Sequence, residues 1–284
     1  MILVTGAVGN IGRELVARLA ARGDRFRVLV RNPERYTPPA DGCEVMEGHF
    51  GAPDMLKRAL AGVDRVFLLS GVHPRMVDLQ TSLIDAAVAQ GVGHVVKLSG
   101  MDADPGSSLT LGRWHGEIER HIEDSGLAYT HLRPNSFMQN LLHQARQIAT
   151  SGKIFAPMRD GRVSLVDVRD IAETAVAVLT GDGHAGRTYT LTGPSALTYD
   201  EVAAALSQIA GRSISYVDTP PDAAREGMIA GGLPDWWADL LVELMEVCAR
   251  GDCARVTDDI EHVTGHPARS FAQFAADHAK RFSA

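Results

Sequence analysis

The sequence predicts a doubly wound α/β protein with a parallel sheet and a small, partly helical C-terminal lobe. The first observation is the start of the chain, where residues 1–4 are all apolar, as in a strand buried on both faces of a parallel sheet. The second is a set of spaced glycines followed at once by helical periodicity. The third is the alternation of short apolar runs and amphipathic segments through residue 132, which indicates parallel strands joined by right-handed crossovers.

The glycine-rich turn is the strongest indication of a ligand. Gly6 permits a tight turn, Gly9 lets the backbone approach a pyrophosphate, and Gly12 lets the helix pack closely on the strand. The helix N-terminus adds unpaired N–H groups and partial positive charge. The spacing Gly-x-x-Gly-x-x-Gly differs from Gly-x-Gly-x-x-Gly, so an ordinary strand-to-helix turn is the alternative. The residues predicted to bind a dinucleotide here are Thr5, Gly6, Val8, Gly9, Asn10, Ile11 and Gly12.

The next elements come in the order that such a sheet requires. Further strands are predicted at residues 26–30, 44–46, 65–69, 94–98 and 127–132. Helices are predicted from about residue 53, where proline is tolerated in a first turn, and over residues 75–90 and 111–123. Ser125-Gly126 is a typical helix stop.

The second half of the chain is less regular. Short strands are predicted at residues 153–155, 162–166, 188–191 and 214–217, and helices at 168–179, 234–249 and 270–281. Asp167 and Asp170 are predicted as carboxylates at a helix N-terminus, favoured by the dipole. We expect residues 1–150 to form a nucleotide-binding Rossmann body. Residues 151–284 are expected to complete the sheet and close the ligand cleft with the lobe, as one compact unit.

Composition argues against several classes of protein. The chain has 284 residues and 45% hydrophobic content, enough for one large core. A net charge of −7 and the absence of a basic stripe argue against a nucleic-acid partner. No charged leader precedes an apolar segment, and no apolar run approaches the roughly 20 residues of a membrane helix. We therefore expect a cytoplasmic protein that does not contact membranes.

Cysteine and histidine spacing predicts neither a disulfide framework nor a metal site. Cys43, Cys248 and Cys253 are odd in number and form no Cys-x-x-Cys pair, so reduced thiols are expected. His262 and His266 have i, i+4 spacing, but Gly265 and the following proline interrupt any helix that would align them.

The end of the second strand indicates which nucleotide binds. An acidic residue about 20 positions past the glycines normally accepts hydrogen bonds from the ribose 2′-OH of NAD. Arg31 holds that place, and neither neighbour is acidic. Because guanidinium pairs with phosphate whereas a carboxylate repels it, NADPH is favoured over NADH. Arg13 and Arg35 are candidate second donors, and a solvated arginine at a loop start is the alternative.

Two further strand ends carry a serine and a glycine where the cleft is expected. Ser70 and Gly71 follow the fourth strand, and Ser99 and Gly100 follow the fifth. A glycine suits close backbone approach to the ribose and nicotinamide, and a simple strand-end turn explains it nearly as well.

Several stretches resemble a known family. Residues 5–12, Thr-Gly-Ala-Val-Gly-Asn-Ile-Gly, resemble the fingerprint of atypical and extended short-chain dehydrogenases. Residues 111–119, 124–126 and 132–140 resemble the NmrA-like branch, which includes NAD(P)H:quinone reductases, triphenylmethane-dye reductases, isoflavone-type reductases and non-enzymatic redox sensors. The resemblance implies that the segment after the sixth strand lines the nicotinamide and substrate site. The residues it implies are Arg133, Pro134, Asn135 and Phe137, with a helix cap by Asn135 or Ser136 as the physical alternative.

The usual proton donor of short-chain dehydrogenases is absent. None of the five tyrosines is followed by lysine at Tyr-x-x-x-Lys spacing. His115 is the candidate proton donor or substrate contact because an imidazole titrates near neutrality, with a structural role on an amphipathic helix as the alternative. Lys153 is a second candidate, or part of a loop before a strand. Hydride transfer to a conjugated acceptor can also proceed without a protein acid.

These features predict an NADPH-dependent reductase that passes a hydride to a flat, electron-poor acceptor such as a quinone, dye or enone. The alternatives are a non-catalytic NADP(H) sensor that binds a regulatory protein, and a tailoring reductase or isomerase for one metabolite. A homodimer is left open, and the acceptor is not specified.

Overall fold

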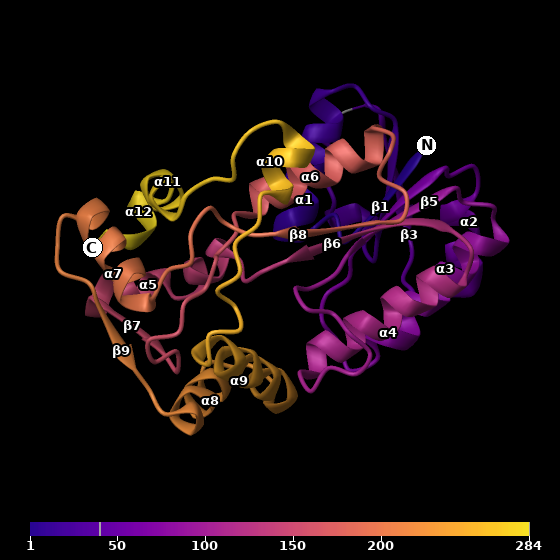
Figure 1. Ribbon diagram of the computed structural model, residues 1–284. Helices are drawn as coiled ribbons and strands as arrows, with labels where there is room; N and C mark the ends of the chain where they lie inside the picture. Colours follow the sequence, from indigo (N-terminus) through magenta and orange to yellow (C-terminus); the bar gives the residue numbers. More distant parts are fainter. Residues whose placement is uncertain (40, 284) are drawn as a thin grey trace.

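The computed structural model describes residues 1–39 and 41–283 and contains a sheet of seven parallel strands with helices on both faces (Figure 1). The strands are β1 (Ile2–Thr5), β2 (Phe26–Val30), β3 (Cys43–Glu47), β4 (Arg65–Leu68), β5 (His94–Leu98), β6 (Ala128–Pro134) and β8 (Arg187–Leu191). Their order is β3-β2-β1-β4-β5-β6-β8. Because β1 lies between β2 and β4, the chain turns in opposite directions on its two sides, and a crevice opens at the carboxyl ends. The predicted doubly wound sheet is confirmed.

Helices cover the sheet in two layers, each over its own hydrophobic core. One layer consists of α1 (Asn10–Ala21), α6 (Val168–Thr180) and α10 (Asp259–Thr264). The other consists of α2 (Pro53–Leu60), α3 (Met76–Ala89) and α4 (Thr110–Asp124). Leu15 and Ile171 are buried on the first face, and Leu83 and Ile118 on the second. A short 3₁₀ turn, η1 (Pro33–Arg35), follows β2.

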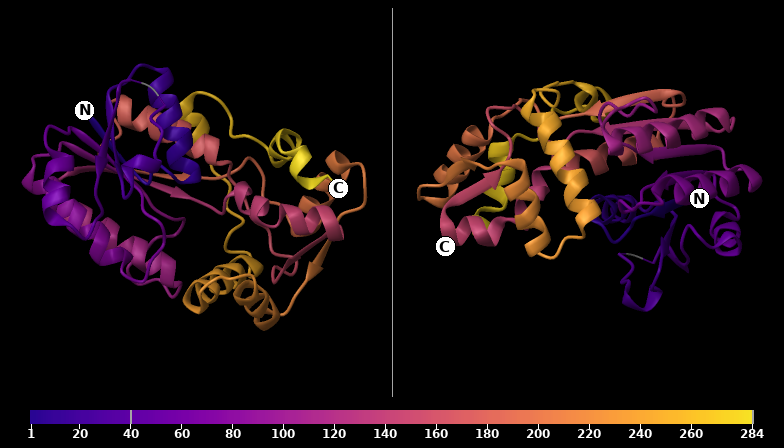
Figure 2. Two further views of the ribbon diagram at one scale, coloured as in Figure 1. Left: turned by 180° about the vertical axis from the view of Figure 1, so that it is seen from behind. Right: turned by 90° about the horizontal axis from the view of Figure 1, so that it is seen from below.

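A lobe lies at one end of the molecule and contains the C-terminus (Figure 2). Its small parallel sheet pairs β7 (Lys153–Ala156) with β9 (Ser215–Asp218). Its helices are η2 (Met138–His143), α5 (Ala145–Ser151), α7 (Tyr199–Ala210), α8 (Pro221–Ala230), α9 (Asp235–Ala249), α11 (Phe271–Asp277) and α12 (Ala279–Phe282). The helical lobe is confirmed, while the division of the chain at residue 150 stays a prediction.

Two predicted elements differ from the structure. Residues 162–166 form only isolated bridges, Val163 with Leu197 and Val166 with Phe137, because two different segments pair with this stretch. The single helix predicted over residues 270–281 is divided at His278 into α11 and α12.

Cys248 and Cys253 form a disulfide, so the expectation of reduced thiols is wrong for this pair. Helix α9 ends at Ala249, and Gly251 in a left-handed conformation (φ 98°) reverses the chain. This turn brings the two Cα atoms to 4.8 Å, within bonding reach, although the spacing matches no familiar motif. Cys43 remains a free thiol.

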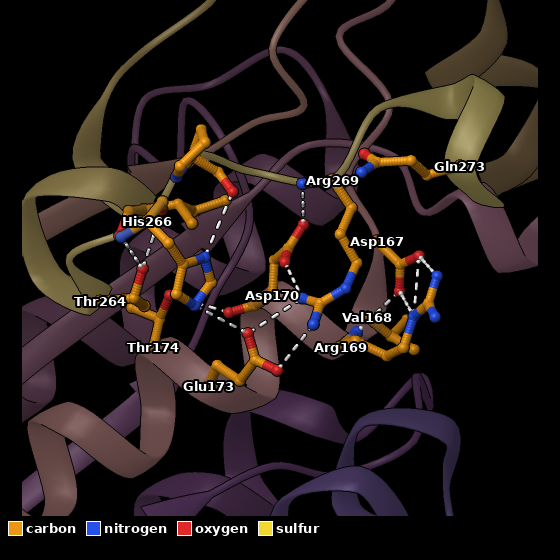
Figure 3. Close-up of polar contacts among 12 residues, drawn as sticks. Asp167, Val168, Arg169, Asp170, Glu173, Thr174, Thr264, His266, Arg269 and Gln273 are labelled. Atoms are coloured by element: carbon orange, nitrogen blue, oxygen red, sulfur yellow. Dashed lines mark hydrogen bonds and ion pairs between the residues drawn. The ribbon is translucent and has the colours of Figure 1, made fainter.

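A network of ion pairs joins Arg269, which lies just before α11, to helix α6 (Figure 3). Asp170 is fully buried and accepts a hydrogen bond from the Arg269 backbone N–H at 2.8 Å as well as from its guanidinium. Arg269 also donates to both oxygens of Glu173 at 2.9 Å, and Glu173 pairs with Arg18 of α1 at the same distance. Burial raises the pKa of Asp170. Asp167 caps α6 by accepting from the Arg169 N–H at 2.9 Å, so its predicted N-terminal role is confirmed.

Replacing Arg269 with methionine is expected to lower the free energy of unfolding by about 3 kcal/mol, because a buried carboxylate loses its cation. The control is Arg22→Met, which removes an ion pair with Asp24 from a half-exposed arginine and is expected to cost under about 1 kcal/mol. Chemical denaturation of both variants measures the difference. Equal losses would contradict the role given to Arg269.

Candidate functional site

The turn after β1 contains glycines with different structural requirements. Gly6 has φ +69°, and a Cβ there would lie 2.7 Å from Leu69 Cγ. A Cβ on Gly12 would lie 2.1 Å from the Gly6 carbonyl oxygen, so α1 packs this closely only on glycine. A Cβ on Gly9 would approach nothing nearer than 3.4 Å. The chain itself therefore does not require glycine at position 9, which is exposed and open to a ligand.

The N-terminus of α1 is uncapped. No side chain caps it, and its first turn contains no acidic residue. Val8, Gly9 and Asn10 are exposed, whereas Ile11 is buried against the sheet. The buried hydroxyl of Thr5, predicted to contact a dinucleotide, accepts a hydrogen bond from Leu69 N at 2.9 Å and donates one to Leu69 O at 2.8 Å. It joins the ends of β1 and β4, and so holds the crevice in shape.

Arg31 is the first residue after β2, at the carboxyl end of that strand, and its side chain is exposed. Within residues 1–39 and 41–283, no side chain forms an ion pair with Arg31, Arg13 or Arg35. An unpaired guanidinium at this position is suited to a phosphate.

The two serines at the strand ends, Ser70 and Ser99, differ in whether their hydroxyl groups have a hydrogen-bond partner. Ser70 accepts a hydrogen bond from the buried Gln80 Nε2 at 2.8 Å, a partner on α3 that sequence reasoning missed. The Ser99 hydroxyl is buried and has no partner in the described part of the chain. A buried hydroxyl without a partner calls for a water or ligand. Gly71 is exposed with open space around it.

The centre of the site is a buried lysine on β5. Lys97 is fully buried, and its Nζ donates to the Leu98 carbonyl at 3.0 Å and to His115 Nδ1 at 3.1 Å. Burial lowers the pKa of Lys97 to about 7, with Arg133 adding to the effect and Glu119 opposing it. Lysine amines with such values can lose or keep a proton near neutral pH. Sequence reasoning missed this residue.

His115 faces Lys97 from helix α4. Burial, together with the charges of Lys97 and Arg133, holds the pKa of His115 well below its usual range. The near-neutral titration on which its selection rested is therefore wrong, and the imidazole is neutral at physiological pH. Because Nδ1 accepts from Lys97, we assign the ring proton to Nε2. Gly100 lies against this ring, since a Cβ there would be 3.2 Å from Cδ2.

An ion pair supports the lysine and histidine. Glu119 lies one turn after His115, on the same face of α4, and is buried. Its carboxylate accepts a hydrogen bond from Arg133 Nε at 3.1 Å and a second hydrogen bond from the same guanidinium. The side chain of Arg133, predicted to contact a cofactor, is thus bound to Glu119. The Glu119 carboxylate and the Arg133 guanidinium are the two charged groups that act on Lys97.

The loop after β6 is anchored by Asn135. Its Nδ2 donates to Ser164 Oγ at 2.7 Å and to the Cys253 carbonyl at 2.8 Å. No side chain caps η2, so the alternative of a cap by Asn135 or Ser136 is wrong. Pro134 ends β6, and its carbonyl accepts from Met101 N at 3.0 Å. The buried amide therefore fixes the loop that presents Phe137.

Phe137 lines an apolar pocket between this loop and the lobe, including helix α9 of the lobe. Other lining residues are Leu141, Met158, Tyr199, Leu244 and Cys248. Glu243 of α9 accepts a hydrogen bond from Thr110 N at 3.1 Å, which fixes α9 to the first turn of the helix that carries His115. Lys153, the second candidate donor, is exposed on β7 and does not line this pocket.

A larger cavity of about 320 Å³ lies at the amino ends of β4, β5 and β6, beside Arg65 and His94. It is at the opposite edge of the sheet from the glycine turn.

Among residues 1–39 and 41–283, no group of three or more histidine, cysteine, aspartate or glutamate side chains is arranged to hold a metal ion. No helix in the same range is long and apolar enough to cross a membrane.

Comparison with known proteins agrees with this geometry. The model of the NmrA-like family matches residues 1–273. The chain belongs to the NmrA-like family. Its relatives include an NAD(P)H azoreductase of Xenophilus azovorans, 41% identical over 100% of both chains. A (4-alkanoyl-5-oxo-2,5-dihydrofuran-3-yl)methyl phosphate reductase of Streptomyces griseus is 41% identical over 100% of this chain and 99% of its own.

A solved NmrA-like neighbour has the same architecture. The NADPH-dependent quinone oxidoreductase QOR2 of Escherichia coli, in complex with NADPH, superposes with a TM-score of 0.90 at 28% identity. The superposition covers 98% of this chain and 99% of that chain. The Rossmann-like body with its lobe is therefore the family's architecture, and the resemblance read in the sequence is confirmed.

Proposed function

We propose that this protein is an NADPH-dependent reductase that transfers a hydride to a quinone-, dye- or enone-like acceptor. The observation that carries the proposal is that an uncapped glycine turn and an imidazole hydrogen-bonded to a buried lysine both lie at the carboxyl ends of the strands. An apolar pocket lies in the segment that follows the next strand, β6. The names of the full-length relatives, an NAD(P)H azoreductase and a reductase of an unsaturated lactone phosphate, support the same chemistry.

The residues present fit a dinucleotide. The N–H groups at the start of α1 would hold the pyrophosphate, with Gly9 allowing its approach. Arg31 would pair with a 2′-phosphate, which makes NADPH the preferred nucleotide. The partnerless Ser99 hydroxyl, with Gly71 and Gly100 at neighbouring strand ends, would meet the ribose and nicotinamide. Bound NADPH supplies a hydride at C4 of the nicotinamide.

The protein's own residues position the acceptor. The apolar walls of the pocket favour a flat, uncharged or delocalised ring system and exclude water from it. The His115 Nε2–H donates to an oxygen or nitrogen of the acceptor and stabilises negative charge that develops there. The segment of Arg133, Pro134, Asn135 and Phe137 acts through its backbone and the Phe137 ring, since two of its polar side chains are bound within the protein.

We also propose a cytoplasmic location, where reduced nicotinamide nucleotides are available. The Cys248–Cys253 disulfide argues against it, because cytosolic thiols are kept reduced. Cell fractionation with non-reducing peptide mapping tests both points. Light scattering distinguishes a homodimer from a monomer, because the dimer has twice the mass of one chain.

Calorimetric titration with NADPH and NADH, followed by acceptor-dependent oxidation in the same sample, tests the function. We expect tight binding of NADPH and loss of the reduced-nicotinamide absorbance with quinones or dyes. Tight binding without oxidation by any acceptor would contradict the reductase and support the alternative, a non-catalytic sensor with a protein partner.

A further inference from the structure

Lys97 is fully buried and contacts His115, although burial of an ammonium group carries a cost that an apolar residue would not have. Lysine is almost never fully buried, because its ammonium group loses its hydration. Here Nζ donates only to the Leu98 carbonyl and to His115 Nδ1 among the described residues. The other ring nitrogen, Nε2, forms no hydrogen bond with the described residues and lies beside Gly100, at the end of β5 where the cleft opens.

We propose that Lys97 is a positioning and proton-supplying residue: it fixes His115 as the Nε2–H tautomer and supplies a proton to the ring as His115 protonates the acceptor. The inference rests on the proposed reductase function. It concerns only acceptors that need a proton, such as an azo group, in which the hydride adds to one nitrogen and the proton to the other.

The proton transfers balance within the pair. As the azo nitrogen takes the proton from Nε2, a proton moves from the Lys97 ammonium to Nδ1. The imidazole stays neutral throughout, and Lys97 is left as the neutral amine. After product release, water protonates Nε2, the Nδ1 proton returns to Lys97, and the original tautomer is restored. One solvent proton is consumed in each turnover.

The charged and titratable groups around the pair come from two neighbouring elements. His115 and Glu119 face Lys97 from α4, and Arg133 and His131 face it from β6. Glu119 stabilises the ammonium form, while Arg133 opposes it. Since burial lowers the pKa of Lys97 to about 7, the donor form is lost as the pH rises through that value. Turnover of an azo dye is therefore expected to fall above neutral pH.

A triarylmethyl dye cation provides the matched acceptor. Hydride addition to its central carbon gives the neutral leuco dye without any proton. In Lys97→Met, turnover of an azo dye is expected to fall by about 10²-fold. Turnover of the cationic dye should change less than about threefold, because only proton supply is removed. The control variant, Lys57→Met, replaces an exposed lysine on α2 and should affect neither acceptor.

A second readout does not depend on turnover. Nitrogen-15 NMR of the histidine rings in the wild-type protein should show His115 as the Nε2–H tautomer. In Lys97→Met a mixture of tautomers is expected, and the pKa of His115 should rise, because a neighbouring positive charge that depresses it is gone. The spectra need no nucleotide or acceptor.

The outcomes separate the two proposals. Absence of turnover with both dyes in the wild type would overturn the reductase, with the spectra still reporting on the pair. Equal losses on both dyes in Lys97→Met, or none on either, would overturn the proton supply. A wild-type Nδ1–H tautomer would also overturn it, even where Lys97→Met fails to fold.

Discussion

Replacing Gly12 with alanine is expected to lower the free energy of unfolding by about 3 kcal/mol. The added Cβ would lie 2.1 Å from the Gly6 carbonyl oxygen and 2.8 Å from Ala7 Cα. Both contacts are with backbone, so relief requires α1 to move away from the turn. Denaturant unfolding measures the loss, and NADPH titration should show weakened binding, because the same movement displaces the N–H groups that hold the pyrophosphate.

The matched control is Gly227→Ala, which also places a methyl group on a helical glycine. Gly227 is exposed on α8 with open space around its Cα, so alanine should leave stability unchanged or raise it by about 0.5–1 kcal/mol. Gly9→Ala should fold normally, since its Cβ approaches nothing nearer than 3.4 Å, yet bind NADPH more weakly. A Gly12→Ala protein as stable as wild type would contradict the close packing of α1.

Arg31→Asp is expected to weaken NADPH binding by about 100-fold or more, while NADH binding changes by less than about threefold. The reason is electrostatic, because the guanidinium that pairs with the 2′-phosphate is replaced by a carboxylate that repels it. Titration calorimetry with both nucleotides measures the two affinities. The difference should shrink as salt screens the exposed charges.

Arg25→Asp is the control for this substitution. Arg25 is highly exposed and lies just before β2, at the opposite end of the strand from Arg31. The Arg25→Asp substitution makes the same change of charge far from the predicted 2′-phosphate site, so the affinities for NADPH and NADH should both stay near wild type. Equal losses of NADPH and NADH binding in Arg31→Asp would remove Arg31 from the 2′-phosphate assignment.

The body was predictable because its elements are specified locally. Strands β2 and β5 have the predicted bounds, since each is a mainly apolar segment after a glycine-containing turn. The lobe was less predictable. Helix α8 has no buried residue, so its sequence has no buried apolar face from which the helix could be predicted. The bridges at Val163 and Val166 depend on partners elsewhere in the chain.

The candidate site shows the same limit. His115 was selected for an ordinary imidazole pKa, which a sequence supplies, but its actual value depends on burial and on Lys97 and Arg133. Lys97 was missed because the sequence does not show that its side chain is fully buried beside His115. The one available signal was a lysine next to the carboxyl end of a predicted strand. Thr5 and Asn135 were chosen as ligand contacts, and both hold backbone segments together.

The most direct test of the central claim follows the hydride itself. NADPH carrying deuterium at the transferable C4 position is incubated with the protein and a triarylmethyl dye cation, whose reduction leaves a stable C–H bond. Mass spectrometry of the leuco dye should find the deuterium on the central carbon, and turnover should be slower than with unlabelled NADPH. Oxidation of NADPH that yields leuco dye without deuterium would contradict direct hydride transfer in this site.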